Sequence, residues 1–337
     1  MLLRWCLLLL VLAALGGCRE SPLRIRSGGA TFVEPLIQAW AAEKYRQSGL
    51  EVDYHRKGSG YGIQQMTERM LDFGCTDAPM SRTELQRARE IGGEILQIPI
   101  TLSSVAVIYN LPNQEGNLVL SGPVLADIFL RKITRWNDPR IGMLNPRITF
   151  PNEAIVPVHR AESSGTTYLF TDYLAKASTG FPEEFAANKK PRWPEGGLAQ
   201  EGSDGVIGHV RRNRYTIGYA EAISARRNGL PCASIPNRTG RPTLPITENV
   251  LSAAEHSPRG ETLSMTDAPG EESYPIVGLS YAVFYRKQSR QIGTAIQDFF
   301  RWAVDDGQTQ AESLGYVPLP QNLRSHAALD LQRMVLE

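Results

Sequence analysis

The chain of 337 residues is long enough for two domains of ordinary size, and its 42% apolar and 21% charged residues are typical of a globular protein in water. Its formal net charge of +1 excludes a global electrostatic attraction to nucleic acid or to an anionic membrane surface. If the protein binds an anion, a local site must therefore hold it.

The N-terminus differs from this average, because residues 7–15 form an unbroken apolar run after Arg4. The run is shorter than the roughly 20 residues that cross a membrane, but it suits the centre of a secretory signal peptide. Two glycines stand directly before Cys18, and this arrangement resembles the lipobox of bacterial lipoproteins. The resemblance implies that residues 1–17 are removed and that Cys18 carries lipid, including palmitate. The alternative is a plain secretory signal followed by a chance cysteine.

The mature chain opens with a repeated order of strand, loop and helix. Short apolar or alternating segments predict strands at 23–26, 52–54 and 72–76. Each strand is followed by a glycine-rich or polar break and then by a helix, the helices starting near residues 33, 63 and 82. The last start is marked by Ser81 and Glu84, a capping box. This rhythm predicts an α/β fold with a largely parallel sheet, in which ligands bind at the carboxyl ends of the strands.

A second set of elements follows Ile98-Pro99-Ile100. The patterns predict strands at 105–109, 155–160, 216–219 and 281–285, and helices with apolar stripes at 124–129, 168–174, 206–211 and 292–303. Residues 186–204 have the composition of a loop, and residues 252–275 are polar and poorly specified.

Four of the strand-to-helix breaks have the features of an anion site. Small residues let the backbone approach a ligand, helix N-termini present free N–H groups, and hydroxyl donors stand at Thr31, Ser59, Ser164 and Thr166. Each hydroxyl taken alone is more simply a helix cap. Their repetition predicts that the four breaks converge on one anion.

Two charged residues refine this prediction. Arg160 ends a predicted strand, and its planar guanidinium suits a bidentate contact with an oxyanion, while Glu162 is placed to pair with it. Asp77 at a neighbouring break would repel a bare anion, but it can accept a hydrogen bond from an anion that keeps a proton. Phosphate keeps a proton near neutral pH, whereas sulfate does not.

Several segments, in the same order along the chain, resemble the periplasmic phosphate-binding protein of the phosphate-specific ABC transporter. They are Gly-Ala-Thr-Phe at 29–32, Val-Asp-Tyr at 52–54 with Gly-Ser at 58–59, Asp-Phe-Gly-Cys-Thr-Asp-Ala-Pro at 72–79, Ile-Thr-Arg-Trp-Asn-Asp at 133–138, Arg-Ala-Glu-Ser-Ser-Gly-Thr-Thr at 160–167 and Ile-Gly-Tyr at 217–219. The chain departs from the family pattern at Glu162, where aspartate is usual, and at Tyr61, where small residues are usual.

The resemblance implies a type II periplasmic-binding-protein fold, with two α/β domains that close on a ligand in the cleft between them. Domain I would comprise residues 24–103 plus 275–337, and domain II residues 104–274. Glu162 would support the arginine. The implied phosphate ligands, with the backbone N–H as donor at 30, 32, 165 and 166, are Ala30, Thr31, Phe32, Ser59, Asp77, Arg160, Ser164, Gly165 and Thr166.

We therefore expect a non-catalytic, periplasmic protein, monomeric and lipid-anchored, that passes inorganic phosphate to the permease and ATPase subunits of an ABC importer. We expect no cofactor, and neither the histidines nor the cysteines have metal-ligand spacing. The alternatives are a phosphate sensor, a receptor for another oxyanion, an enzyme using Ser164 with His159, and a structural or adhesive lipoprotein. Cys75 and Cys232 are either paired or both free.

Overall fold

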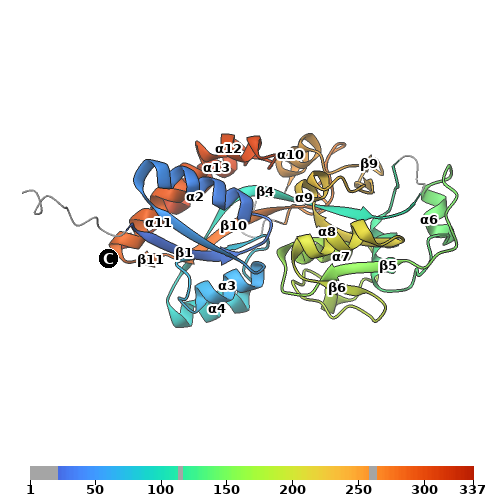
Figure 1. Ribbon diagram of the computed structural model, residues 1–337, viewed down its shortest axis with the longest axis horizontal. Helices are drawn as coiled ribbons and strands as arrows, with labels where there is room; N and C mark the ends of the chain where they lie inside the picture. The colour runs from blue at the N-terminus through green and yellow to red at the C-terminus, as the bar shows by residue number, and fades with distance from the viewer. Residues whose placement is uncertain (1–21, 113–116, 258–263) are drawn as a thin grey trace, which may run out of the picture.

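One sheet of eight strands runs through the whole molecule (Figure 1). The computed structural model describes residues 22–112, 117–257 and 264–337, so the predicted signal peptide and Cys18 lie outside the described residues. None of the helices within these ranges is both long and apolar enough to cross a membrane. The strands, in spatial order, are β2 (Glu51–Arg56), β1 (Arg24–Gly29), β3 (Phe73–Thr76), β10 (Val277–Tyr285), β4 (Ile95–Tyr109), β7 (Thr216–Glu221), β5 (Val156–Arg160) and β6 (Leu198–Gln200).

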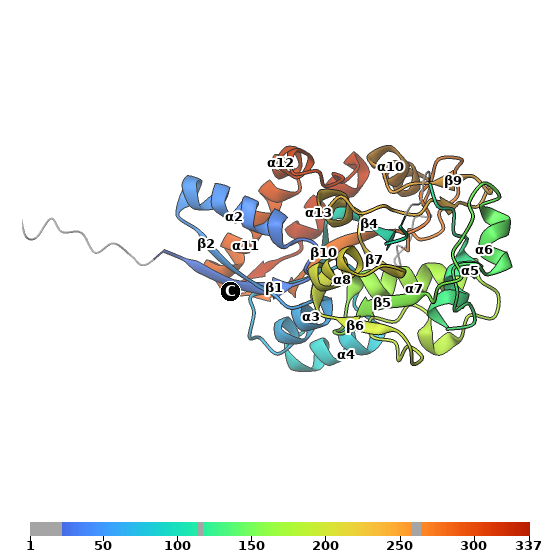
Figure 2. The same cartoon turned by 45° about the vertical axis from the view of Figure 1, so that its right-hand side comes forward.

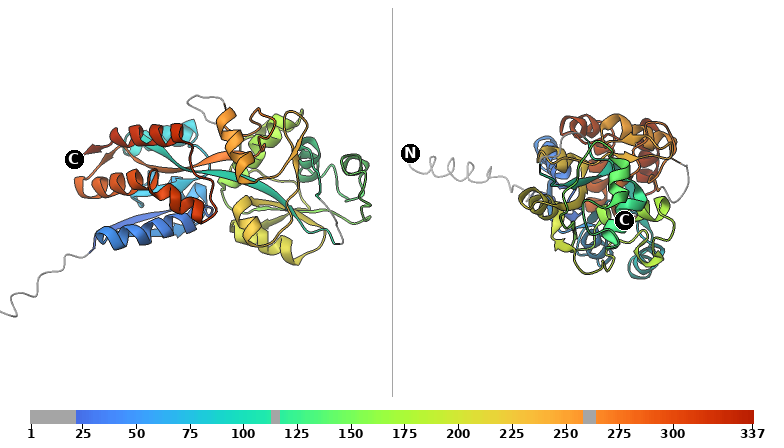
Figure 3. Two further views of the ribbon diagram at one scale, coloured as in Figure 1. Left: turned by 90° about the horizontal axis from the view of Figure 1, so that it is seen from above. Right: turned by 90° about the vertical axis from the view of Figure 1, so that its right-hand side faces the viewer.

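The two ends of this sheet belong to two lobes. At one end β1 pairs in parallel with β2 and β3, and at the other end β5 pairs in parallel with β6 and β7. Between these groups, β10 and β4 pair antiparallel with each other, β10 also with β3, and β4 also with β7. Figure 3 shows these two strands passing from the lobe formed by both ends of the chain to the lobe formed by its middle.

The strand β4 corrects the sequence prediction, which separated Ile98-Pro99-Ile100 from a strand at 105–109. The structure has one strand of 15 residues, Ile95–Tyr109, and every residue from 98 to 109 is buried. Proline has no N–H to donate within a sheet and is found at bulges. The register between β4 and β10 shifts between Ser280 and Tyr281, and Tyr281 is the partner of Pro99, so an irregularity accommodates the proline without ending the strand.

The first lobe buries an aromatic core against its part of the sheet. Trp40 is fully buried and donates its indole N–H to the carbonyl of Gly307 at 2.9 Å, and Phe73 packs edge-on against Phe300 with ring centroids 4.9 Å apart. Residues from both ends of the chain therefore share one core. The helices are α2 (Glu34–Ser48), α3 (Ser59–Thr67), α4 (Arg82–Ile91), α11 (Arg290–Ala303), α12 (Gly307–Ser313) and α13 (Gln321–Gln332).

The middle of the chain forms the second lobe and the segments near the crossing strands. Figure 2 shows α5 and α6 at the end of this lobe that is remote from the first lobe. The aromatic rings of Phe170 and Tyr219 stack in its core, with centroids 4.4 Å apart. The helices are α5 (Gly122–Phe129), α6 (Pro139–Leu144), α7 (Gly165–Ala177), α8 (Gly202–Arg212), α9 (Ala222–Arg227) and α10 (Thr247–His256), with a 3-10 turn, η1, at Glu183–Phe185. Short strands, two of them in the first lobe, are β8 (Ile235–Pro236), β9 (Pro242–Thr243), β11 (Lys287–Gln288) and β12 (Val335–Leu336).

Two helices begin one turn earlier than their apolar pattern predicted. α3 begins at Ser59 rather than near Ile63, and α8 begins at Gly202 rather than near Val206. Both first turns are rich in glycine and serine, so they carry no apolar stripe. The capping box of Ser81 and α4 is present as predicted, with both of its hydrogen bonds formed.

The two cysteines within the described residues, Cys75 and Cys232, are not paired. Cys75 is buried in β3, Cys232 is half-buried, and both thiols are free. Burial raises the pKa of Cys75 above its usual value and raises the pKa of Cys232 to about 11. Both groups are therefore protonated at neutral pH and are poor nucleophiles.

Gly29 offers a test of the close packing between β1 and β3. Its φ is +136°, and a Cβ added there would lie 2.1 Å from the carbonyl oxygen of Cys75 on the neighbouring strand. We expect Gly29→Ala to lower the free energy of unfolding by about 3 kcal/mol or more. Gly142→Ala is the control, because nothing lies within 4 Å of its Cβ and alanine favours the helix. Urea denaturation measures both, and equal stabilities of the two variants would contradict the close approach at Gly29.

Candidate functional site

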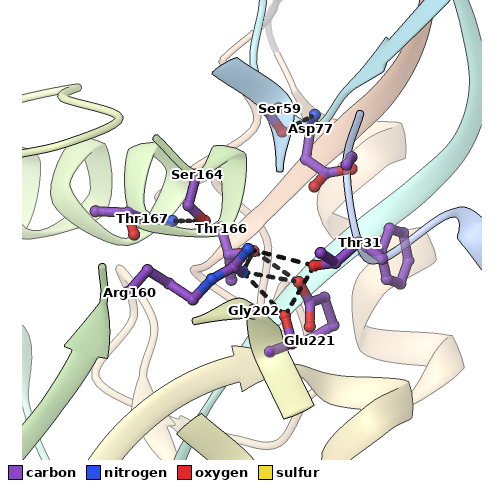
Figure 4. A network of polar contacts seen from close by, with 12 residues as sticks. Thr31, Ser59, Asp77, Arg160, Ser164, Thr166, Thr167, Gly202 and Glu221 are labelled. Atoms are coloured by element: carbon purple, nitrogen blue, oxygen red, sulfur yellow. Dashed lines mark hydrogen bonds and ion pairs between the residues drawn. The ribbon is translucent and has the colours of Figure 1, made fainter. Parts of the chain in front are cut away.

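Four strand-to-helix connections meet where the lobes face each other. Three follow β1, β2 and β3 in the first lobe, and the fourth joins β5 to α7 in the second lobe. Figure 4 shows the side chains that the sequence analysis selected on these connections, which the structure brings together: Thr31, Ser59, Asp77, Arg160, Ser164 and Thr166.

Arg160 lies at the centre of the site. Its side chain is only 2% exposed, and its guanidinium donates five hydrogen bonds to protein oxygens. The acceptors are Glu162 Oε1, at 2.7 Å from Nε and also bonded to Nη2, Thr166 Oγ1 at 3.2 Å, Ser203 Oγ at 2.9 Å and Thr31 Oγ1 at 3.3 Å. Because Thr31 belongs to the first lobe and the others to the second, the arginine links the two lobes.

Two carboxylates balance the charge of Arg160. Glu162 pairs with it directly, so the side chain that is longer than the aspartate usual in the family still reaches the guanidinium. Glu162 also accepts the backbone N–H of Gly202 at 3.2 Å, which fixes its position at the start of α8. Glu221 Oε1 lies 3.7 Å from Nη1 of Arg160. Burial lowers the pKa of Arg160, but these two carboxylates outweigh it and raise the pKa overall.

Asp77 lies on the first-lobe side of the site and is 4% exposed. Its Oδ1 accepts the hydroxyl of Ser280 at 2.7 Å, and its backbone N–H donates to Ser59 Oγ at 3.2 Å. Burial, and then the charge of Glu221, raise the pKa of Asp77 to about 7, although Ser280 and Arg160 act in the opposite direction. The carboxyl group therefore changes its ionisation near neutral pH.

The first turn of α7 presses against the first lobe at Gly165. A Cβ at this position would lie 2.7 Å from Cβ of Asp77 and 2.7 Å from Oγ of Ser59, so a larger residue would hold the lobes apart. N–H groups in the first turn of a helix have no partner within the helix. Among the described residues, those of Gly165 and Thr166 have no acceptor, and they open the helix beside Asp77.

In the connection between β1 and α2, one of the backbone N–H groups that we expect to bind the ligand is already bonded within the protein. The N–H of Ala30 donates to the carbonyl of Cys75 at 2.9 Å, so Ala30 is tied to the neighbouring strand and is not available to a ligand. In the part of the chain that the structure describes, the N–H groups of Thr31 and Phe32 have no acceptor. Ser164 acts as a helix cap, since its Oγ accepts the N–H of Thr167 at 3.3 Å.

Two ion pairs cross between the lobes at the rim of the site. Arg56 reaches Asp204 on α8 at 2.7 Å while also contacting Glu34 at 3.2 Å, and Lys189 reaches Glu84 on α4 at 2.7 Å. Arg56 is thus a partner in an inter-lobe contact. A cavity opens between the lobes here, lined in part by Thr31, Arg56, Lys57, Glu162, Gly202 and Asp204.

Sequence reasoning missed Ser203, Glu221 and Ser280. Ser203 lies in the first turn of α8, where the sequence pattern predicts a loop, and Ser280 lies within a buried strand at the irregular point of the sheet. Glu221 is the last residue of the buried strand β7, and it is 2% exposed. A carboxylate placed at the end of an apolar strand was the one available signal, since charged residues are rarely fully buried without a role.

The arrangement gives no support to the enzyme hypothesis. The Oγ of Ser164 accepts the N–H of Thr167, while Nδ1 of His159 lies 3.1 Å from the carbonyl oxygen of Arg160. No hydrogen bond joins His159 to Ser164 among the described residues, although a catalytic serine needs a base within such reach. Likewise, no group of three or more potential metal ligands occurs in the described part of the chain.

The fold and the site together define a two-lobed solute-binding protein. A family model described as a PBP superfamily domain matches residues 19–307. The phosphate-binding protein PstS of Pasteurella multocida is 37% identical over 305 residues, covering 89% of this chain and 87% of that protein. The PstS of Haemophilus influenzae is 36% identical over 307 residues, covering 89% and 90%.

Solved structures agree on the fold. A phosphate-binding protein from Stenotrophomonas maltophilia matches with a TM-score of 0.70 at 19% identity, covering 91% of this chain and 93% of that one. A high-affinity periplasmic phosphate-binding protein with bound phosphate matches with a TM-score of 0.72 at 21% identity, with the same coverages. The predicted type II periplasmic-binding-protein fold is confirmed. The chain belongs to the PstS family of phosphate-binding proteins within the PBP superfamily.

The raised pKa of Asp77 has a consequence for stability. Between about pH 4, where an unfolded aspartate ionises, and about pH 7, the folded chain holds a proton that the unfolded chain has lost. Raising the pH through this window therefore lowers the free energy of unfolding, and Asp77→Asn abolishes this contribution.

We expect the loss of stability between about pH 5 and about pH 8.5 to be smaller in Asp77→Asn than in the natural protein, by on the order of 2–4 kcal/mol. Urea denaturation in phosphate-free buffers measures the difference. The other ionisable groups are common to both proteins and cancel, so parallel pH profiles would show that Asp77 ionises normally.

Proposed function

We propose that the protein binds one inorganic phosphate between the lobes at Arg160 and Asp77 and delivers it to an ABC-type phosphate importer. The observation that carries the proposal is that the buried guanidinium of Arg160 and the buried carboxyl group of Asp77 lie in one site, which the N-terminus of α7 also lines. The PstS relatives, similar over 89% of the chain, are named as phosphate-binding proteins, which supports the same function. Catalysis has no part in the function of this family, in agreement with the sequence prediction.

The charged residues would divide the recognition between them. Arg160 and the free N–H groups offer donors to the oxygens of the anion, as suits an oxyanion. Asp77 in its ionised form accepts a hydrogen bond from a P–OH group. Sulfate brings no such proton and would face an unpaired buried charge, which in favourable cases reduces binding by about 10⁴-fold. The site would therefore prefer phosphate to sulfate.

The ligand set that we propose follows the sequence analysis with one omission and one addition. Ala30 is left out because its N–H is bonded within the protein. Ser203 is added because its hydroxyl, like that of Thr31, accepts a hydrogen bond from the guanidinium of Arg160. Glu162 supports the arginine. The proposed ligands are Thr31, Phe32, Ser59, Asp77, Arg160, Ser164, Gly165, Thr166 and Ser203.

The domains that we propose are residues 24–103 plus 275–337 and residues 104–274, with hinge motion at the crossing strands β4 and β10. Closure about a hinge would bring the α7 N-terminus onto Asp77 and Ser59, and the contact at Gly165 is of this kind. The protein would act as a monomer in the periplasm, with the permease and ATPase subunits of the importer as its partners.

We further propose that Cys18 anchors the protein to a membrane through lipid. Support comes from the apolar run at 7–15 and the small residues before Cys18. In cells fed labelled palmitate, we expect the natural chain to become labelled and to fractionate with membranes. Cys18→Ala should lose the label, while Cys6→Ala, which changes the segment that is removed, should keep it. Label retained in Cys18→Ala would exclude this attachment site.

The binding function is tested by calorimetric titration of the mature protein after bound ligand has been removed. We expect phosphate to bind tightly with one site per chain, and sulfate not to bind at about pH 8.5, where Asp77 is ionised. Asp77→Asn should gain measurable sulfate binding, because the amide no longer repels the dianion and can donate to it. Folded, ligand-free protein that binds no phosphate would refute the proposal, and binding of sulfate as tight as that of phosphate would favour a general oxyanion receptor.

A further inference from the structure

Glu221 is a buried carboxylate that the proposed ligand set does not use. It ends β7 beneath the site and is 2% exposed. Its Oε1 accepts the hydroxyl of Thr166 at 2.7 Å and lies 3.7 Å from Arg160. Its Oε2 is buried and has no hydrogen-bond partner among the described residues. A buried charged oxygen without a partner is costly, so its retention in the site calls for a functional reason.

The contact with Thr166 fixes the direction of one hydroxyl group. A threonine hydroxyl has a single proton, and Thr166 donates it to Glu221 while its oxygen accepts a bond from Arg160. In this arrangement the side chain of Thr166 has no proton left for an anion, and only its backbone N–H faces the ligand. Glu221 thus positions both Thr166 and Arg160 from behind.

The charge of Glu221 also changes the balance of the site. Arg160 contributes one positive charge, and Glu162 and Glu221 contribute two negative charges, so these three residues sum to −1. Ionisation of Asp77 brings the sum to −2. A buried like charge opposes the ionisation of a neighbouring carboxyl group. Glu221 therefore favours the protonated form of Asp77, which Figure 4 shows on the opposite side of Thr31.

The other groups around Asp77 either favour its ionised form or stay uncharged. Arg160 favours its ionised form, and the hydroxyls of Ser280 and Ser59 do the same by hydrogen bonding. Burial raises the pKa of the remaining acidic groups around the two carboxylates well above neutrality, so that they stay uncharged: Tyr54, Cys75 and Tyr316. Glu162 forms its ion pair with Arg160 and makes no hydrogen bond with Asp77 among the described residues. Glu221 is thus the charged group that opposes ionisation of Asp77.

We propose that Glu221 is a positioning residue that acts through Thr166, Arg160 and Asp77, and that it sets the pH range over which the site distinguishes phosphate from sulfate. The inference rests on the proposed phosphate-binding function. While Asp77 is ionised, it accepts a hydrogen bond from the P–OH group of phosphate and repels sulfate. Once it is protonated, it can donate to either anion, and the distinction is lost. Neutralising Glu221 favours the ionised form of Asp77, so selectivity should persist to lower pH.

The test compares phosphate and sulfate affinities of the mature protein by calorimetry, in steps from about pH 5.5 to about pH 8.5. The natural protein should lose selectivity as the pH falls, with a midpoint in the neutral range. In Glu221→Gln we expect the midpoint to move down by about one pH unit. Glu221→Asp, which keeps the charge, should stay close to the natural midpoint. Glu255→Gln is the matched control, because this exposed residue on α10 undergoes the same change of charge away from the site.

The outcomes separate this inference from the function on which it rests. If the natural protein binds no phosphate, the proposed function itself fails. If it binds phosphate with a selectivity that does not change with pH, or if Glu221→Gln keeps the natural midpoint, the role of Glu221 is refuted. If Glu221 had a purely structural role, its replacement would weaken the binding of phosphate and of sulfate equally, and the pH midpoint of the selectivity would not change. Should the glutamine variant not fold, Glu221→Ser makes the same comparison with a smaller neutral side chain.

Discussion

The buried guanidinium of Arg160 constrains the architecture around it. A charge taken out of water must be matched by opposite charge and by acceptors for each of its N–H groups. Here the acceptors come from the end of β5, the first turns of α7 and α8, and the β1–α2 connection of the other lobe. Four of the five hydrogen bonds go to acceptors in the second lobe, and the fifth, to Thr31 at 3.3 Å, forms only when the lobes face each other closely, so this bond ties the chemistry of the site to the arrangement of the lobes.

Different contacts between the lobes carry different weight. The rim pairs Arg56–Asp204 and Lys189–Glu84 include partly exposed side chains, and such pairs typically stabilise by only about 0–1 kcal/mol. The contact of Gly165 with Asp77 and Ser59 is buried and leaves no room for a Cβ, which would lie 2.7 Å from each of these residues. The buried contact therefore limits how closely the two lobes can approach each other, while the partly exposed rim pairs are weakened by salt.

The sequence predicted those features that depend on local pattern. Strand-to-helix repeats follow from apolar periodicity, and Asp77 and Arg160 could be selected because each stands at the end of a strand. Features that depend on tertiary partners were not predictable in this way. The continuity of β4 past Pro99 relies on the irregular register of β10, the first turn of α8 carries no apolar stripe, and α12 and α13 bury few apolar side chains. Glu221 acquires its role only from the neighbours that the fold places beside it.

The two crossing strands also bear on how such a chain reaches its folded state. β10 lies between β3 and β4, and α11 and α12 complete the core around Trp40 and Phe73. The lobe formed by the N-terminal residues therefore lacks the strand that joins β3 to β4, and part of its aromatic core, until the last part of the chain has been made. A chain with such distant pairings folds late and slowly. Because Tyr281 pairs with Thr76, the sheet of the first lobe can be completed only after the whole second lobe has been synthesised.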